Sequence, residues 1–176
     1  ANRTDYDLRH HQEGSGRGLA YRDEEKKEWV VQYVIEPSAG VDRCFLTLLC
    51  DAYEEETKPN GETRTVLHLH PRIAPTQIGV FPLVRKDGMP EKARELFERL
   101  RTTYRCFYDQ GGTVGRRYSL QDEQGTPFCV TVDSQTLEDG TVTVRDRETM
   151  AQDRVAPDQL VAFLDDRIRT WSPRTS

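Results

Sequence analysis

The sequence has no long apolar run, and this absence excludes a membrane-spanning helix. Such a helix needs about 20 consecutive apolar residues, whereas hydrophobic residues make up 35% of the 176 residues and are scattered among charged ones. The amino terminus also lacks the basic-then-apolar pattern of a signal peptide. We therefore expect a cytoplasmic protein without membrane partners, long enough for one domain or two small ones.

Metal-binding and phosphate-binding motifs are also missing. The cysteines show no CxxC spacing, so we expect buried or free thiols in a reducing compartment. His68 and His70 alternate on an expected strand and could ligate a metal together, but no third ligand is near in the sequence, and we predict no metal site. Neither GxGxxG nor GxxxxGK[ST] occurs, which argues against an unrelated α/β nucleotide-binding domain.

Charge of one sign is not in large excess. The formal net charge is −5. Residues 1–74 hold 10 basic and 14 acidic residues, giving −4, and residues 75–176 hold 15 and 16, giving −1. These values argue against a general nucleic-acid coat, but RNA recognition depends on a local basic face and on base-edge contacts more than on total charge. The second half is the better candidate for an RNA contact.

The second half does contain alternating strand and helix patterns. Continuous apolar runs bounded by turn residues predict buried strands, and apolar residues at helical spacing predict amphipathic helices between them. Asp139-Gly140 is typical of a hairpin turn. We expect an α/β fold with a mixed, mostly parallel sheet. The predicted strands are at 78–84, 106–108, 128–132 and 141–145, and the predicted helices are at 90–104, 114–123 and 157–169.

The first half is organised differently. The patterns predict a strand at 29–35, a helix at 41–52 and a strand at 66–70, with an exposed charged connector at 54–64 and a domain boundary near 71–76. The later charge run from Arg145 to Glu148 follows a strand, and we expect it to be a solvated face without a catalytic role.

The junction from Val34 to Arg43 places charged residues between an expected strand and an expected helix. A helix start presents unpaired N–H groups that favour an anion, and Arg43 can add a fork of donors one turn in. Glu36 could pair with an ammonium group, and Ser38 could supply a hydroxyl beside it. The pattern suits a small molecule with a cation at one end and phosphates at the other, although a capped connection with Arg43 in solvent explains the same spacing as well.

The string VIEPSAGVDR at 34–43 resembles motif 3 of class II aminoacyl-tRNA synthetases, in the form found in homodimeric glycyl-tRNA synthetases. The opening ANRTDYDLRHHQEGSG and the later stretches HPRIAPTQIGVFPLV, VGRRYSLQDEQGTPFCVTVD and TLEDGTVTVRDRETM are similar to the same family. The resemblance implies that residues 1–74 form the carboxy-terminal, motif 3 part of an antiparallel-sheet catalytic domain. It implies that residues 75–176 form an anticodon-binding domain with a mixed five-stranded sheet and flanking helices.

The same resemblance implies a part of a glycine–tRNA ligase, which activates glycine with ATP and transfers it to tRNA(Gly). Mg²⁺ and a homodimer are expected from the family. The chain begins inside what would be the catalytic domain, without motifs 1 and 2, so we expect it to be inactive alone. The residues implied to bind glycine are Glu36, Pro37, Ser38, Ala39 and Gly40, and those implied to contact ATP are Gly40, Val41, Asp42 and Arg43.

The segment from Arg116 to Tyr118 is the expected tRNA contact. Arg116 and Arg117 open a helix with donors for phosphate or a base edge, and Tyr118 offers a stacking face. Salt bridges from these arginines to Asp122 or Glu123 explain the same pattern. A non-catalytic synthetase-like RNA-binding module or polymerase accessory subunit is the alternative function, which the joint presence of the motif 3 residues disfavours.

Overall fold

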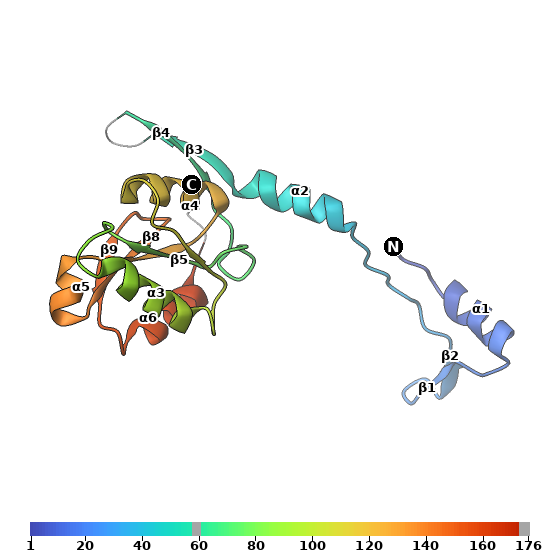
Figure 1. Ribbon diagram of the computed structural model, residues 1–176. Coiled ribbons are helices and arrows are strands. Elements are labelled where there is room, and N and C mark those ends of the chain that lie inside the picture. Colours follow the sequence, from blue (N-terminus) through green and yellow to red (C-terminus); the bar gives the residue numbers. More distant parts are fainter. Residues whose placement is uncertain (58–60, 173–176) are drawn as a thin grey trace. The chain divides into compact units, whose positions relative to one another are not determined.

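The structure, a computed structural model, describes residues 1–57 and 61–172 (Figure 1). The chain divides into two compact units, Ala1–Phe45 and Leu46–Ser176. Helix α2, Val41–Ala52, carries the chain from one unit into the next, and it lies where the sequence predicts a helix. Among the described residues, no helix combines the length and the apolar character that crossing a membrane requires.

The first unit holds one helix and one small hairpin. Helix α1, Tyr6–Ser15, is followed by strands β1, Tyr21–Asp23, and β2, Glu28–Val30, which pair antiparallel. The strand predicted over 29–35 is therefore wrong beyond Val30. Ile35 makes only an isolated bridge with Asn2 and is 69% exposed, so the apolar character of this stretch is not used to bury a strand.

The second unit is built on a five-stranded sheet in the order β6-β5-β7-β8-β9. The predicted mixed α/β fold is confirmed, but the sheet is not mostly parallel, because β5 pairs parallel with β6 and β7 whereas β8 pairs antiparallel with β7 and β9. The strands are β5 Ile78–Pro82, β6 Cys106–Tyr108, β7 Phe128–Val132, β8 Val142–Asp146 and β9 Gln152–Val155.

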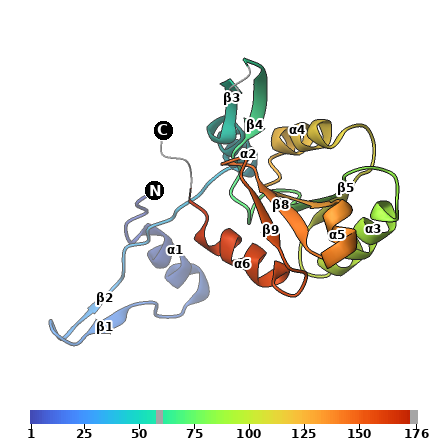
Figure 2. The same cartoon turned by 90° about the vertical axis from the view of Figure 1, so that its left-hand side faces the viewer.

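Helices cover both faces of this sheet (Figures 1 and 2). Helices α3, Met89–Leu100, and α6, Leu160–Thr170, pack on one face and close an apolar core with Ile78 and Val80. Side chains alternate along a strand, and the ring of Phe81 accordingly meets α4, Val114–Gln124, on the other face. The apolar core thus lies between the sheet and helices α3 and α6, and α4 covers the opposite face of the sheet.

Two connections differ from the sequence predictions. The stretch 54–64 is not simply an exposed loop, because β3, Tyr53–Thr57, and β4, Thr63–Leu67, form an antiparallel hairpin whose central residues 58–60 lie outside the described part. The Asp139-Gly140 pair is not a hairpin turn. Asp139 ends the short helix α5, Ser134–Asp139, and Gly140 caps it with φ of 77°. The Asp-Gly pair suits both a hairpin turn and the end of a helix, since both structures require a residue with positive φ.

The charge run after β8 is buried, so the prediction of a solvated face is wrong. Arg145 is 7% exposed and donates to both carboxylate oxygens of Asp122, at 2.8 and 2.9 Å. Asp122 also accepts a bond from Arg64 of β4 at 2.9 Å, and Arg64 bonds Glu56 of β3 at 2.7 Å. These pairs link the hairpin to the face of the sheet that α4 covers.

Arg147 is fully buried and completes the same layer. Its guanidinium bonds the carboxylate of Glu148 and donates to the carbonyls of Gly125, at 2.6 Å, and Leu69, at 2.9 Å. Gly125 has φ of +78°, and a Cβ there would lie 2.8 Å from Cδ1 of Leu69. Only glycine permits this close approach of the chain after α4 to the connector before β5.

Candidate functional site

The carboxyl ends of the parallel strands border an open hollow in the second unit. From β5 the chain passes through α3 to β6, which pairs with one edge of β5. It then passes through α4 to β7, which pairs with the other edge of β5. Ligands bind in open α/β sheets at such a point, outside the carboxyl ends of the strands. The hollow has a volume of about 570 Å³ and is lined by residues 83–85 after β5, by Gln110 and Gly112 after β6, and by Thr113, Val114 and Arg117 at the start of α4.

Arg117 fixes the walls of this hollow. It is 2% exposed, and its Nη1 donates to the carbonyls of Pro82, at 2.7 Å, and Asp109, at 3.2 Å. Its Nη2 donates to the carbonyl of Leu83 at 3.3 Å. Burial lowers the pKa of Arg117 from its ordinary value, yet guanidinium stays charged in proteins. One buried cation thus holds together the loops that follow β5 and β6.

Further donors suit the hollow to an anion. Arg85 Nε donates to the carbonyl of Gln110 at 2.6 Å, which places an exposed guanidinium beside the loop after β6. Thr113 caps α4, its hydroxyl accepting a bond from the N–H of Arg116 at 3.3 Å, and Arg116 is exposed. The positive end of the α4 dipole adds to these charges. The arrangement suits a negatively charged, extended ligand.

The structure separates the three residues expected to contact tRNA. Arg116 is exposed beside Gly112 at the hollow, whereas Arg117 lines the hollow but is buried and donates to backbone carbonyls. Tyr118 is half-buried, its hydroxyl bonds Thr131 at 2.6 Å, and burial raises its pKa. The ring of Tyr118 also lies under a guanidinium, that of Arg145, with 4.9 Å between the ring centroid and Cζ.

The salt bridges considered as an alternative for these arginines are not the ones that form. Asp122 is occupied by Arg64 and Arg145 instead, both of which come from strands. Arg85 and Gln110 are two residues of the hollow that the sequence does not single out. Their signal is weak, because polar residues directly after predicted strands are common, and only the pairing order of the strands brings them to one edge.

The motif 3 segment lies in the first unit, where every residue from Glu36 to Arg43 is exposed. The backbone N–H of Glu36 donates to the Ala1 carbonyl at 2.9 Å. The Glu36 carboxylate lies 3.7 Å from Arg3 Nε. Arg43 is in the first turn of α2, as predicted. The segment therefore displays these side chains on its surface, and the glycine and ATP contacts stay a prediction.

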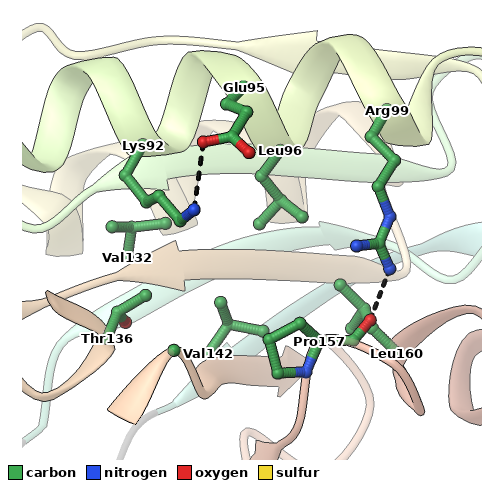
Figure 3. A pocket seen from close by; sticks show the side chains of 10 residues that line it. Lys92, Glu95, Leu96, Arg99, Val132, Thr136, Val142, Pro157 and Leu160 are labelled. Atoms are coloured by element: carbon green, nitrogen blue, oxygen red, sulfur yellow. Dashed lines mark hydrogen bonds and ion pairs between the residues drawn. The ribbon is translucent and has the colours of Figure 1, made fainter. Parts of the chain in front are cut away.

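A second cavity is smaller and apolar (Figure 3). It has a volume of about 130 Å³ and lies between α3, β7, β8 and the start of α6, with Leu96, Val132 and Leu160 in its walls. The charged groups at its rim already have partners, since Lys92 bonds Glu95 at 3.0 Å and Arg99 bonds a backbone carbonyl. It has few polar groups to orient a ligand, so the hollow is the better candidate site.

Comparison with known proteins decides the family. The family model described as "Anticodon binding domain" matches residues 77–167. The chain belongs to the anticodon-binding domain family. The match contains the hollow at the carboxyl ends of β5 and β6 together with the whole of the five-stranded sheet.

Sequence relatives extend the similarity to the first unit. The chain is 50% identical to the glycine–tRNA ligase of Lachnospira eligens and 51% identical to that of Thermobifida fusca, each over 96% of this chain. The predicted resemblance to the carboxy-terminal part of glycyl-tRNA synthetases is thereby confirmed. The chain spans about a third of the length of these relatives, 36% and 37% respectively.

One solved structure supports the fold. A prolyl-tRNA synthetase from Cryptosporidium parvum, solved with halofuginone and AMPPNP, aligns with 65% of this chain and 30% of its own at a TM-score of 0.55 and 18% identity. At this identity the likeness concerns the fold alone.

Proposed function

We propose that the hollow at the carboxyl ends of β5 and β6 binds the anticodon stem and loop of a tRNA. The observation that carries this proposal is the position of two exposed guanidiniums, Arg85 and Arg116, beside a capped helix start in the domain that matches the anticodon-binding family. Phosphate contacts position a nucleic acid and base-edge contacts specify it. Arg85 and Arg116 supply the first, and the side-chain amide of the exposed Gln110 is suited to the second.

Arg117 has a positioning role in this proposal. It lines the hollow but is 2% exposed, and its guanidinium ties the backbone of the loop after β5 to that of the loop after β6. Replacement by methionine should therefore weaken tRNA binding by loosening both loops, without removing a phosphate contact. A loss of affinity with an unchanged salt slope is the expected signature.

We further propose that the chain acts as part of a glycine–tRNA ligase, with tRNA(Gly), glycine and ATP as substrates, Mg²⁺ as the ion bound with ATP, and a homodimer in the cytoplasm. The support is the similarity of nearly the whole chain to such ligases. In this proposal residues 1–74 belong to the catalytic domain and residues 75–176 to the anticodon-binding domain. Glu36 and Ser38 would hold the glycine ammonium, and Arg43 would face the ATP phosphates.

The motif 3 role makes physical sense. When the glycine carboxylate attacks the α-phosphate of ATP, anions meet and charge builds on the transferring group, and a fixed guanidinium stabilises that charge. In the complete enzyme, Arg43→Ala should lower the rate of glycine-dependent ATP–pyrophosphate exchange by about 10²-fold or more. A near-normal rate would remove Arg43 from the site.

Binding of tRNA(Gly) by the 176-residue chain tests the hollow. Arg116→Ala should weaken binding and reduce the slope of log affinity against log salt by about 1, because one phosphate contact is lost. Arg169→Ala is the matched control, since Arg169 is an exposed arginine of α6 paired with Asp166. Equal losses in the two variants would show that only overall charge matters, and would count against the hollow.

A further inference from the structure

The β3–β4 hairpin carries three potential metal ligands on one side. Its register pairs Glu54 with Val66 and Glu56 with Arg64, and the N–H of His68 continues the pairing by bonding the carbonyl of Ala52 at 2.7 Å. Directly paired residues point to the same face of a hairpin, as do residues two apart. Glu54, Glu56 and His68 therefore share a face, and one ligand atom from each lies within 4.8 Å of the others.

Two of the three ligand–ligand distances match the geometry of a bound metal ion. His68 Nε2 lies 3.2 Å from Glu54 Oε2 and 3.3 Å from Glu56 Oε1. Ligands at the corners of a tetrahedron, each about 2.0 Å from a zinc ion, lie about 3.3 Å apart. Despite these short distances, Nε2 is buried and makes no hydrogen bond within the described residues, so neither carboxylate lies along the direction of an N–H at this nitrogen.

The other side of the imidazole is fixed as in metal sites. His68 Nδ1 lies 2.6 Å from Glu148 Oε2, while Glu148 Oε1 is held by Arg147. A carboxylate on one ring nitrogen sets the tautomer that leaves the other nitrogen with its lone pair for a metal. The second Glu56 oxygen, Oε2, accepts a bond from Arg64 at 2.7 Å, which orients Oε1 toward His68.

Carboxylate oxygens of Glu54 and Glu56 lie close to the buried Nε2 of His68. The lone pair on His68 Nε2 and the nearby carboxylate oxygens repel one another, so a positive charge between these atoms would stabilise the arrangement. A proton on Nε2 or a metal ion would supply it.

We propose that Glu54, Glu56 and His68 form a site for a divalent transition-metal ion of the zinc class, with Glu148 orienting the imidazole. One imidazole nitrogen and two carboxylate oxygens suit Zn²⁺ better than Ca²⁺ or Mg²⁺, which prefer oxygen ligands alone. Because Glu54 and Glu56 come from β3 and His68 directly follows β4, the ion would clamp the base of the hairpin. The proposal does not depend on the function proposed above.

Calorimetric titration of the chelator-treated 176-residue chain with Zn²⁺ tests the site. We expect one ion per chain, and a melting temperature that rises with zinc concentration because the ion binds the folded state. Glu54→Gln should weaken zinc binding by about 10-fold or more, and His68→Gln should abolish it. His11→Gln is the control, because His11 is an exposed histidine of α1, and it should leave the affinity unchanged.

Two results would overturn the proposal. The first is an absence of zinc binding to the folded wild-type chain, which would mean that a proton satisfies Nε2. The second is zinc binding that survives in Glu54→Gln and His68→Gln alike, which would place the ion elsewhere. Glu54 is exposed on the hairpin, so its variant keeps the test informative even if the His68 variant unfolds.

Discussion

Replacement of Asp122 by asparagine probes the buried charged layer between α4 and the sheet. The Asp122 side chain is 3% exposed and accepts two bonds from Arg145 and one from Arg64. The asparagine side chain would keep the shape but remove the charge, leaving two guanidiniums near a neutral amide. Removing one partner of a buried ion pair costs about 3–5 kcal/mol. Arg64 keeps its bond to Glu56, whereas Arg145 is left with the Tyr118 ring, so Arg145 should account for most of the loss.

Urea unfolding followed by far-UV circular dichroism measures this loss. Since native domains are stable by about 5–15 kcal/mol, a decrease of about 3–5 kcal/mol would shift the midpoint strongly at an unchanged m-value. Asp158→Asn removes a charge from an exposed aspartate and should change the unfolding free energy by less than about 0.5 kcal/mol. A loss below about 1 kcal/mol in Asp122→Asn would refute the claim that these pairs are desolvated and mutually dependent.

Three further substitutions or treatments have defined outcomes. A hydrogen bond from Arg154 is the main reason that the pKa of Asp133 is lowered to about 2, so Arg154→Met should raise that pKa in an NMR titration. The Arg154–Asp133 pair stabilises the folded state at pH values above the ordinary pKa of a carboxyl group. The difference in unfolding free energy between wild type and Arg154→Met should therefore be constant near neutral pH and should disappear as the pH falls from about 4 toward 2. Gly125→Ala should destabilise the protein by about 1–3 kcal/mol in urea unfolding, because its positive φ and a nearby leucine leave no room for Cβ, whereas Gly115→Ala, with open space around it, should not. Burial raises the pKa of Cys129 to about 12, so this thiol should resist a thiol reagent until urea unfolds the chain, while the two exposed cysteines react at once.

Strong local patterns make the central layer of the fold predictable. The strands at Ile78–Pro82 and Phe128–Val132 are buried along their whole length, and a continuous apolar run is the signal of such a strand. The helix at Val114–Gln124 also lies where the sequence predicts one, since Thr113 caps its start and Gly125 its end. The family resemblance adds the number of strands, which periodicity alone does not provide.

The charged residues are not predictable where pairing partners are far apart in the chain. The sequence analysis places Arg145 in solvent because nothing near it shows that it faces Asp122, which lies 23 residues away on α4. The sequence predicts a loop at the hairpin containing Glu54, Glu56 and Arg64 because β3 consists mainly of consecutive charged residues and lacks the alternating apolar residues of a typical strand. Both errors have one cause: these residues are charged, and their burial depends on ion pairs between parts of the chain that are distant in sequence.

Cross-linking of tRNA(Gly) to the 176-residue chain, with the linked peptides located by mass spectrometry, tests the central claim most directly. The account predicts that nucleotides of the anticodon loop link to residues 83–85 and 110–116, around the hollow, and that a changed anticodon lowers the yield. Links from the anticodon loop confined to the α3 and α6 face, or equal yields with both tRNAs, would contradict it.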